Sequence, residues 1–299
     1  MLWLVAIISS YFLLAAVHLV DKYILGERIP NSKVYTFYVG VSGVLVLILV
    51  PFGFLDIPKT SGIFLALIAG AFHTLAIFAL FTGLKKFEAS RIIPAVGAFL
   101  PLFTFSFILM QDGKNLAFLD TIVFFLLLLG AFLITWEKKK AISFKSIRIS
   151  ALTAFLFALY FISIKFVYSS QPFISGLIWT RIGAVLIALC FLFFKEVRTD
   201  ILRGPKIAQK KTWAIVLPNQ AAGGLAVLLQ NWAVALAPFA YLGIINALEG
   251  VKYVFLLILA VLLSLKFPQL LKEQISKEVI LQKIVAILLI SAGLALLAF

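Results

Sequence analysis

The chain has 299 residues, of which 64% are hydrophobic and only 13% are charged, and its mean hydropathy is +1.15. Soluble domains average about 45–50% apolar and about 25% charged residues, so the composition excludes an ordinary soluble domain. The apolar runs are continuous and about twice as long as the ~10-residue alternating segments of a membrane β-barrel. An all-α membrane protein is therefore predicted.

The formal net charge is +14 at pH 7, a balance that would also suit a protein that binds nucleic acid. The Lys and Arg residues, however, concentrate in alternate loops between apolar runs. Membrane proteins carry such basic loops on their cytoplasmic side. We therefore predict a lipid bilayer, and no nucleic acid, as the partner of this charge.

Hydropathy predicts ten membrane spans, each close to the roughly 20 residues that cross a bilayer. The predicted spans are residues 2–20, 34–54, 61–84, 92–110, 118–135, 150–167, 175–194, 213–235, 241–265 and 280–299. The first span lacks a basic leader, so we expect it to be retained and not cleaved as a signal peptide. Loops after odd-numbered spans carry 21 Lys and Arg, and loops after even-numbered spans carry 3. This bias predicts a multi-pass protein of the cytoplasmic (inner) membrane with cytoplasmic odd-numbered loops and both termini outside.

The chain also repeats itself weakly. Residues 12–23 resemble residues 155–166 at an offset of 143, and residues 84–89 resemble residues 235–240 at an offset of 151. The spacing is consistent over four pairs of spans, so two related halves are predicted.

The halves are expected to cover residues 1–140 and 141–299, with five spans in each, and the additional residues fall in the basic loop 195–212. Because five is odd, the second half enters the membrane in the opposite direction. Such inverted-topology repeats are used by alternating-access transporters, which bind their substrate near the midplane between the halves.

The ninth span contains a polar stripe formed by Asn246, Glu249, Lys252 and Tyr253. At 3.6 residues per turn these four positions fall within an arc of about 120°. A charge near the bilayer centre costs about 2.5–3.5 kcal/mol, so such residues face a partner or a wet cavity. Two hypotheses follow. Glu249 and Lys252 can form an i,i+3 ion pair that joins helices, or the stripe binds substrate, with Lys252 on an anionic group or Glu249 exchanging a proton.

Four more candidate substrate contacts lie on the third, sixth and seventh spans. Arg181 stands beside Trp179 and either extends to the membrane interface or clamps a carboxylate or phosphate. Lys165, near Tyr160, either extends to the interface or belongs with Lys252 and Arg181 to a basic set that lines the cavity. His73 either joins helices by a hydrogen bond or couples protons, because histidine titrates near physiological pH.

The eighth span contains Pro218 and the pair Gly223-Gly224. Together they predict an interrupted helix whose exposed backbone groups are tolerated only beside protein or a cavity. Asn219 and Gln220, next to the proline, are therefore further candidate substrate contacts.

The sequence predicts no metal and no cofactor. Cys190 is the only cysteine, so a disulfide within the chain and a cysteine-based metal site are impossible. The two histidines, His18 and His73, lie on separate spans. No phosphate-binding P-loop is present, which argues against transport driven directly by ATP.

Three features carry a family resemblance over nearly the whole chain. They are a first span that ends in a lysine, seen at Lys22 and again at Lys165, a short polar link 88–91 between the third and fourth spans, and a Gly-containing apolar end at 291–294. With these features the chain resembles the EamA-like family of the drug/metabolite transporter (DMT) superfamily. The resemblance implies secondary transport through a central cavity lined mainly by the first, third, fourth, sixth, eighth and ninth spans. The chain departs from the family at Lys252, where a proline is expected.

We therefore expect a secondary transporter, not an enzyme, that moves a small metabolite by alternating access. The basic candidates favour an amino acid or another carboxylate-bearing solute, with export and uptake equally open. Coupling to protons or to solute exchange is expected, as is a monomer or a homodimer. The alternatives are a flippase of a lipid-linked substrate on the same fold and an intramembrane enzyme, although paired acids or an activated nucleophile are not evident.

Overall fold

The structure is a computed structural model that describes residues 2–87, 89–112, 118–135, 144–202, 210–266 and 277–298. Within these ranges the regular structure is entirely helical, which confirms the all-α prediction. The α-helices are α1 (Leu2–Tyr23), α2 (Ser32–Ser42), α3 (Thr60–Lys86), α4 (Ala89–Asp112), α5 (Phe118–Thr135), α6 (Phe144–Ser170), α7 (Phe173–Cys190), α8 (Lys195–Leu202), α9 (Lys210–Leu236), α10 (Leu242–Ala247), α11 (Glu249–Lys266) and α12 (Lys277–Ala298). Short turns of other helix types extend them: η1 (Ile24–Arg28), η2 (Gly43–Phe52), η3 (Phe191–Phe193) and η5 (Phe239–Tyr241).

Seven of the described segments are long and apolar enough to cross a membrane, so the chain is a multi-pass membrane protein. They are Leu2–Arg28, Ser32–Phe52, Thr60–Lys86, Phe144–Ser170, Phe173–Phe193, Lys211–Leu236 and Phe239–Leu256. Three shorter apolar helices, Ala95–Met110, Thr121–Gly130 and Ile284–Gly293, lie within α4, α5 and α12. Each of these segments overlaps with one of the predicted spans.

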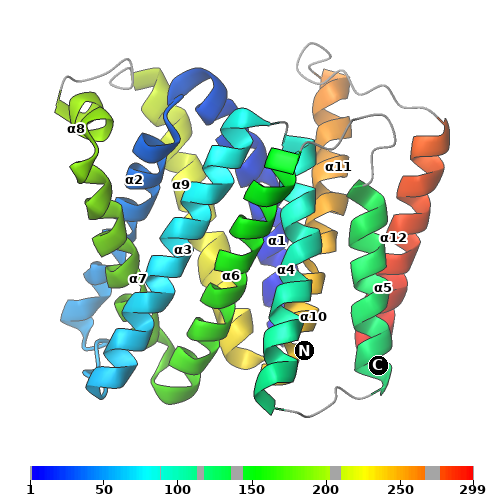
Figure 1. Cartoon of the computed structure of the whole chain (residues 1–299), viewed down its shortest axis with the longest axis horizontal. Coiled ribbons are helices and arrows are strands. Elements are labelled where there is room, and N and C mark those ends of the chain that lie inside the picture. Colours follow the sequence, from blue (N-terminus) through cyan, green and yellow to red (C-terminus); the bar gives the residue numbers. More distant parts are fainter. Residues whose placement is uncertain are drawn as a thin grey trace.

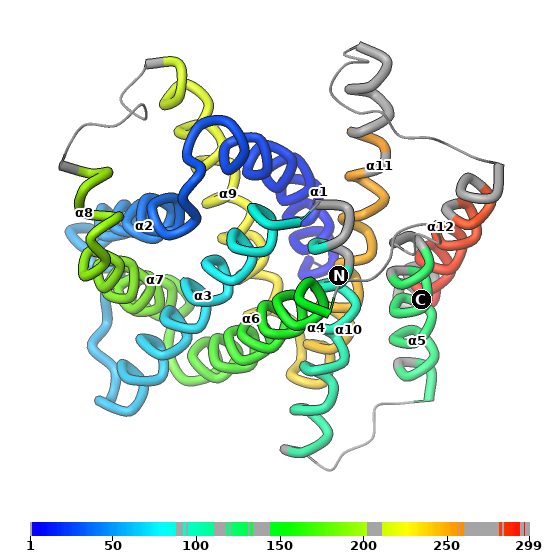
Figure 2. Tube along the Cα trace, turned by 45° about the horizontal axis from the view of Figure 1, so that its top comes forward, coloured from blue at the N-terminus to red at the C-terminus, as the bar shows by residue number. Residues whose placement is uncertain are grey.

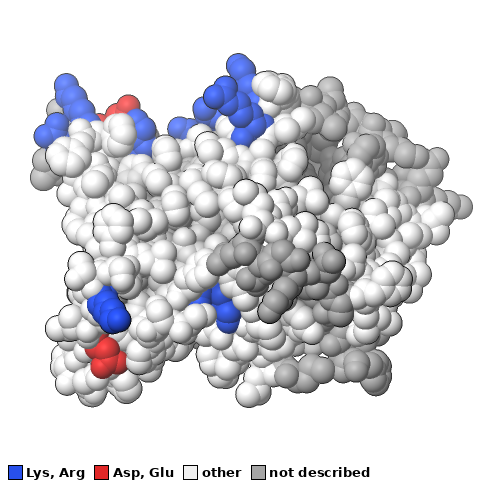
Figure 3. Space-filling model, turned by 60° about the horizontal axis from the view of Figure 1, so that its bottom comes forward, with Lys and Arg blue, Asp and Glu red and all other residues white. Residues whose placement is uncertain are grey.

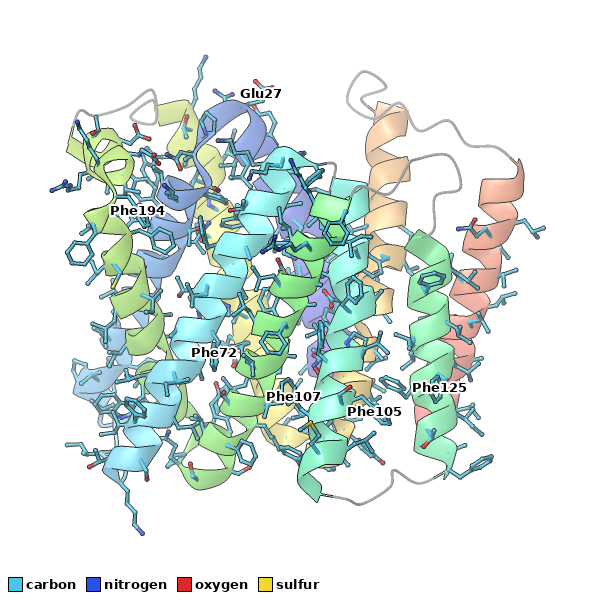
Figure 4. All side chains as sticks on the ribbon, viewed as in Figure 1. Glu27, Phe72, Phe105, Phe107, Phe125 and Phe194 are labelled. Atoms are coloured by element: carbon cyan, nitrogen blue, oxygen red, sulfur yellow. The ribbon has the colours of Figure 1, made fainter. Side chains whose placement is uncertain are left out.

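The helices stand side by side, and α5 and α12 form a pair at one edge of the molecule (Figures 1 and 2). In the rest of the bundle, α3 packs against α6 and α7, α1 packs against α9 and α11, and α4 packs against α6 and α10. Many large apolar side chains are exposed on the outside of the bundle. Phe125 on α5, labelled in Figure 4, is 50% exposed, as suits a side chain that faces lipid.

Backbone contact joins α3 to α7. A Cβ atom added to Gly70 would lie 2.0 Å from the carbonyl oxygen of Thr180, and one added to Gly183 would lie 2.3 Å from that of Leu67. Only glycine permits this approach, since small residues allow helices to pack closely in membranes. The two glycines therefore fix the distance between these helices.

Three local expectations were wrong. Part of the predicted loop after the seventh span is the helix α8, which buries Val197. The eighth span was expected to be interrupted, but α9 runs unbroken through Pro218, because membrane helices accommodate a proline when neighbouring groups satisfy the freed carbonyl. The ninth span was expected to be continuous, but it is divided between α10 and α11.

The basic side chains gather at one end of the bundle, along the upper rim of Figure 3. The described basic residues at this end include Lys22, Arg28, Lys33, Lys85, Lys86, Lys145, Arg148, Lys195, Arg198 and Lys211. Lys59, just before α3, lies at the opposite end. The predicted boundary between the halves, at residue 140, lies outside the described residues.

The end with many basic groups also carries α8, which is joined to α2 by an exposed ion pair. Lys33 Nζ lies 3.0 Å from Glu196 Oε2 and 4.3 Å from the ring centroid of Phe194, labelled in Figure 4. The hydrogen bond from Lys33 holds the pKa of the Glu196 carboxyl below its usual value.

Candidate functional site

The helix interruption lies at Leu248. The amide of Leu248 donates to the carbonyl of Ile244 over 2.9 Å, and the amide of Val251 donates to the carbonyl of Leu248 over 2.9 Å. The second bond closes a tighter turn than an α-helix has. As a result, Glu249 is the first residue of α11, where the helix dipole stabilises a negative charge.

Glu249 and Lys252 form a buried ion pair. The Lys252 ammonium donates to Glu249 Oε1, and the side chains are only 4% and 8% exposed for Lys252 and Glu249, respectively. The other carboxylate oxygen, Oε2, is buried and has no hydrogen-bond partner among the described residues. Each charge is thus the counter-ion of the other, and one acceptor remains unused.

The other two residues of the predicted stripe face α4. Asn246 Nδ2 donates to Thr104 Oγ1 over 2.9 Å, and its Oδ1 is buried with no partner in the part of the chain that the structure describes. The hydroxyl of Tyr253 donates to the carbonyl of Ile93 over 2.7 Å. From α1, Tyr11 donates to a carbonyl of α10 over 2.8 Å. The stripe is therefore enclosed by protein, and two of its acceptors, Glu249 Oε2 and Asn246 Oδ1, are unbonded within the described ranges.

A second polar group, here called the Asp21 cluster, joins α1, α2 and α9. Its members are His18, Asp21, Tyr35, Asn219 and Gln220. Asp21 Oδ1 accepts bonds from the Tyr35 hydroxyl over 2.6 Å and from Asn219 Nδ2 over 2.7 Å. Gln220 Nε2 donates to the Tyr35 hydroxyl over 3.1 Å. Asp21 itself is 4% exposed, so a carboxylate is buried where three helices meet.

A third polar group, the Asn231 cluster, lies toward the other end. The hydroxyls of Tyr160 and Tyr168 both donate to Asn231 Oδ1 over 2.9 Å. The ring of His73 lies 4.8 Å from that of Tyr160. Arg181 is half-buried, and its positive charge acts on His73 and on both tyrosines. Arg181 is thus a half-buried cation beside this cluster, and among the described residues no hydrogen bond holds its guanidinium.

Lys165 and Lys22, which occupy equivalent positions in the repeat, each bind carbonyl groups at the end of a helix, and they do so at opposite ends of the bundle. Lys165 Nζ donates to the carbonyls of Val234, Ala235 and Ala237, at the end of α9. Lys22 Nζ donates to carbonyls at positions 84 and 87, at the end of α3. The last carbonyls of a helix lack partners within it, and a lysine there is favoured by the helix dipole. Contact of Lys165 with a substrate stays a prediction.

The candidate residues thus fall into separate groups. Asn246, Glu249, Lys252 and Tyr253 lie together at the α10–α11 junction, Asn219 and Gln220 belong to the Asp21 cluster, and Tyr160, His73 and Arg181 lie in or beside the Asn231 cluster. Within the described residues no group of three or more His, Cys, Asp or Glu side chains could hold a metal ion.

Asp21 and Tyr35 were not among the candidates. Hydropathy ends the first span at residue 20, so Asp21 reads as a loop residue, whereas α1 continues to Tyr23 and η1 to Arg28. A local signal did exist, because His18 and Asp21 are three residues apart and share a helix face.

Comparison with solved structures supports the fold. Of the solved structures, 27 chains match. One of them, described only as "Crystal structure of protein", aligns with a TM-score of 0.64 at 18% sequence identity, covering 97% of this chain and 94% of its own. Such a likeness shows a shared fold alone. No family model matches the chain, and no curated protein matches it.

Proposed function

We propose that the protein is a secondary transporter of the EamA-like, drug/metabolite transporter type, built from two inverted five-helix halves, residues 1–140 and 141–299. In this proposal the ten predicted spans cross the cytoplasmic membrane, and both termini lie outside. The observation that carries it is the ion pair between Glu249 and Lys252, buried at a break in a membrane helix. Broken helices with polar groups near the midplane are typical of substrate sites in transporters.

The depth of the pair supports this assignment. Glu249 lies ten residues after Phe239, the start of its candidate span. At a rise of ~1.5 Å per residue this distance is about 15 Å, half the thickness of the hydrocarbon layer. An ion pair at the midplane costs desolvation energy that an apolar helix would avoid, which favours a role in binding.

Reciprocal packing supports the two inverted halves. In the proposed repeat, α1 corresponds to α6 and α3 to α9. The contact of α1 with α9 then has its counterpart in the contact of α6 with α3. The contact of α4 with α6 likewise corresponds to that of α11 with α1. The matching roles of Lys22 and Lys165 at opposite ends fit the same relation.

Charge balance favours a zwitterionic substrate such as an α-amino acid. An anion that bound Lys252 would leave Glu249 buried without a counter-ion. A cation that bound Glu249 would leave Lys252 buried without one. Breaking a buried ion pair in this way costs about 3–5 kcal/mol. A zwitterion offers a partner to both charges, and its ammonium group can donate to Glu249 Oε2 and Asn246 Oδ1, which have no partner among the described residues.

Thermal unfolding of the purified protein tests this proposal. The proteinogenic α-amino acids are compared with their amides, which keep only the cationic group, and with their N-acetyl forms, which keep only the carboxylate. A ligand at 100 times its Kd stabilises a protein by about 2.7 kcal/mol. We expect at least one zwitterion to raise the Tm, its two derivatives to have no effect, and Glu249→Gln/Lys252→Met to lose the shift. Equal shifts with a derivative, or none with any amino acid, would reject a zwitterion site.

A further inference from the structure

Helix α4 contains a carbonyl group that cannot form its usual helical hydrogen bond. Pro101 lies inside α4 and has no N–H, so the carbonyl of Gly97, four residues earlier, receives no bond from position 101. A proline ring also clashes with the carbonyl four residues before it, which tilts that carbonyl out of line with the helix. Gly97 and Pro101 are both buried and share one face of α4. A backbone acceptor is therefore present on this buried face.

Two side-chain contacts define how α4 lies against α10 and α11, which are its neighbours in the bundle (Figure 1). Asn246 of α10 bonds to Thr104. The hydroxyl of Tyr253 of α11 occupies the place where a Cβ atom on Gly97 would lie. Residue numbers thus rise along one helix while they fall along the other, so α4 and the α10–α11 segment are antiparallel.

This register places Glu249 at the level of Pro101, since each lies three residues along its helix from the contact of Asn246 with α4. The charge of Glu249 acts on the hydroxyl of Tyr253, which lies against Gly97. A helical carbonyl points toward the residue four positions later, here from Gly97 toward Pro101. The carbonyl of Gly97 and the unbonded Oε2 of Glu249 therefore lie at the same level of the bundle.

A further acceptor is the side-chain oxygen of Asn246, and Thr104 fixes its orientation. The hydroxyl of Thr104 donates to the carbonyl of Leu100 over 2.9 Å. A hydroxyl has one hydrogen to donate, so it can only accept from Asn246. The amide nitrogen of Asn246 must therefore face Thr104, and Oδ1 is left without a partner among the described residues.

We propose that Glu249 Oε2, Asn246 Oδ1 and the carbonyl of Gly97 together bind one primary ammonium group of the substrate. An –NH3+ group has three N–H donors, one for each acceptor. The inference rests on the proposed function, because it describes how the cationic end of the zwitterion is held. It adds α4 to the site and narrows the substrate class to amino acids with a primary amine. Proline and N-methylated amino acids, which have fewer donors on nitrogen, are then poor substrates.

The proposed repeat gives the two ends of an amino acid different partners. At the offset of 151 residues, Pro101 corresponds to Lys252 and Gly97 to Leu248, where the ninth span is divided. Regular helical bonding is thus disturbed at equivalent positions, but one half presents a backbone acceptor and the other a side-chain ammonium group. An amino acid between them can direct its ammonium group to Gly97 and its carboxylate to Lys252. Backbone carbonyls released at broken helices are typical cation ligands in transporters.

Methylation of the substrate nitrogen tests the three acceptors. The proteinogenic amino acids are titrated in thermal unfolding of the full chain in lipid nanodiscs, and each one that raises the Tm is compared with its N-methyl, N,N,N-trimethyl and α-methyl forms. All of these remain zwitterions. We expect N-methylation to raise the Kd about ten- to a hundredfold, as for the loss of one hydrogen bond to a charged group, and trimethylation to abolish binding. The α-methyl form keeps three donors, so it controls for size and should bind like the parent amino acid.

The outcomes separate this inference from the proposed function. An N-methyl form that binds as tightly as its parent would overturn the ammonium site with three acceptors and leave the zwitterion site intact. The absence of a Tm shift with every amino acid would reject the proposed function, and this inference with it.

Pro101→Ala tests the carbonyl of Gly97. Alanine supplies an N–H that bonds this carbonyl within the helix, and it is well suited to a helix interior. We expect weaker binding of the parent amino acid and little further effect of N-methylation, so the ratio of the two Kd values should fall toward one. Pro218→Ala, inside α9, is the matched control and should keep the wild-type ratio. An unchanged ratio in Pro101→Ala would exclude the carbonyl of Gly97 from the site.

Transport gives an independent measurement. Proteoliposomes are loaded with an unlabelled derivative, and counterflow of the radiolabelled parent amino acid into them is followed. We expect the α-methyl form to drive counterflow and the N-methyl form at the same concentration to drive none. Equal counterflow with both forms would overturn the inference. Absence of counterflow with every parent amino acid would instead reject the transport of amino acids, and the binding series would decide on the ammonium site by itself.

Discussion

Single residues reveal where the protein keeps charge inside an apolar bundle. Lys252 and Glu249 neutralise each other, Lys165 and Lys22 bind carbonyls, and Asp21 accepts from neutral donors. The buried charges are therefore stabilised in three ways, by an opposite charge, by carbonyl groups or by neutral donors. Each way predicts a different effect of substitution.

Removal of one member of the central ion pair should be worse than removal of both. Lys252→Met leaves the Glu249 carboxylate buried without a counter-ion, so we expect the free energy of unfolding to fall by about 3–5 kcal/mol. Glu249→Gln/Lys252→Met should recover most of that stability, because no charge remains, but it should lose amino-acid counterflow. Thermal unfolding and counterflow of the three proteins measure both effects. If the double variant still transports amino acids, the ion pair has only a structural role.

Lys165→Met should destabilise the protein through the end of α9. Its ammonium serves three carbonyls, and hydrogen bonds to charged groups contribute about 1.5–3 kcal/mol. A loss of this size in thermal unfolding, with amino-acid binding unchanged in the folded protein, is the expected result. Lys59→Met at an exposed position is the control and should stay within about 0.5 kcal/mol of the wild type. Reduced binding at unchanged stability would instead support the predicted substrate contact.

At the scale of the elements, close helix contacts depend on glycine at particular positions. Gly70→Ala would bring a methyl group to within 2.0 Å of the Thr180 carbonyl, so α3 and α7 must separate. We expect a clear fall in Tm. Gly224→Ala is the matched control, since no atom lies within 4 Å of the position of its Cβ, and alanine is the better helix former by about 1 kcal/mol. An equal fall of Tm in both variants would show that the close α3–α7 contact does not determine the stability.

The contact of α8 with α2 should weaken in acid. Because the pKa of Glu196 is lowered in the folded protein, its ion pair with Lys33 stabilises the contact above the usual glutamate pKa and is lost as the pH falls through the lowered value. The protection of α8 from hydrogen exchange, measured relative to the intrinsic exchange rate at each pH, should therefore fall at low pH, and Glu196→Gln should show the lower protection already at neutral pH. Exchange that is the same in both proteins at neutral pH would contradict this.

For the whole molecule, the uneven distribution of charge predicts which end faces the cytoplasm. In a Cys190→Ser background, Lys145→Cys belongs to the end with many basic groups and Lys59→Cys to the other. A membrane-impermeant maleimide added to intact cells should label the cysteine at position 59 and not the one at position 145. The reverse pattern would invert the topology.

The sequence predicted the helices well because apolar runs of span length are a local property. It did not predict the Asp21 cluster, since Asp21 and Asn219 are 198 positions apart and meet only after α1 packs against α9. The stripe on the ninth span was visible because its four residues lie within eight consecutive positions of the sequence. The division at Leu248 was not predicted. No proline lies near it, and hydropathy carries no information about where an α-helix tightens into a narrower turn.

The difference between two helix contacts bears on how the bundle can deform. Backbones touch where α3 meets α7, and the attraction between close-packed atoms is lost over a fraction of an ångström. Where α2 meets α9, by contrast, the bridge is made by long side chains, with Tyr35 bonded to Asn219 and Gln220 and Tyr38 set edge-on to Trp213. Water can replace such polar bonds at little net loss. In a conformational change, α3 and α7 should therefore stay in contact and move as one unit. The helices α2 and α9 should separate from each other at the basic end of the bundle.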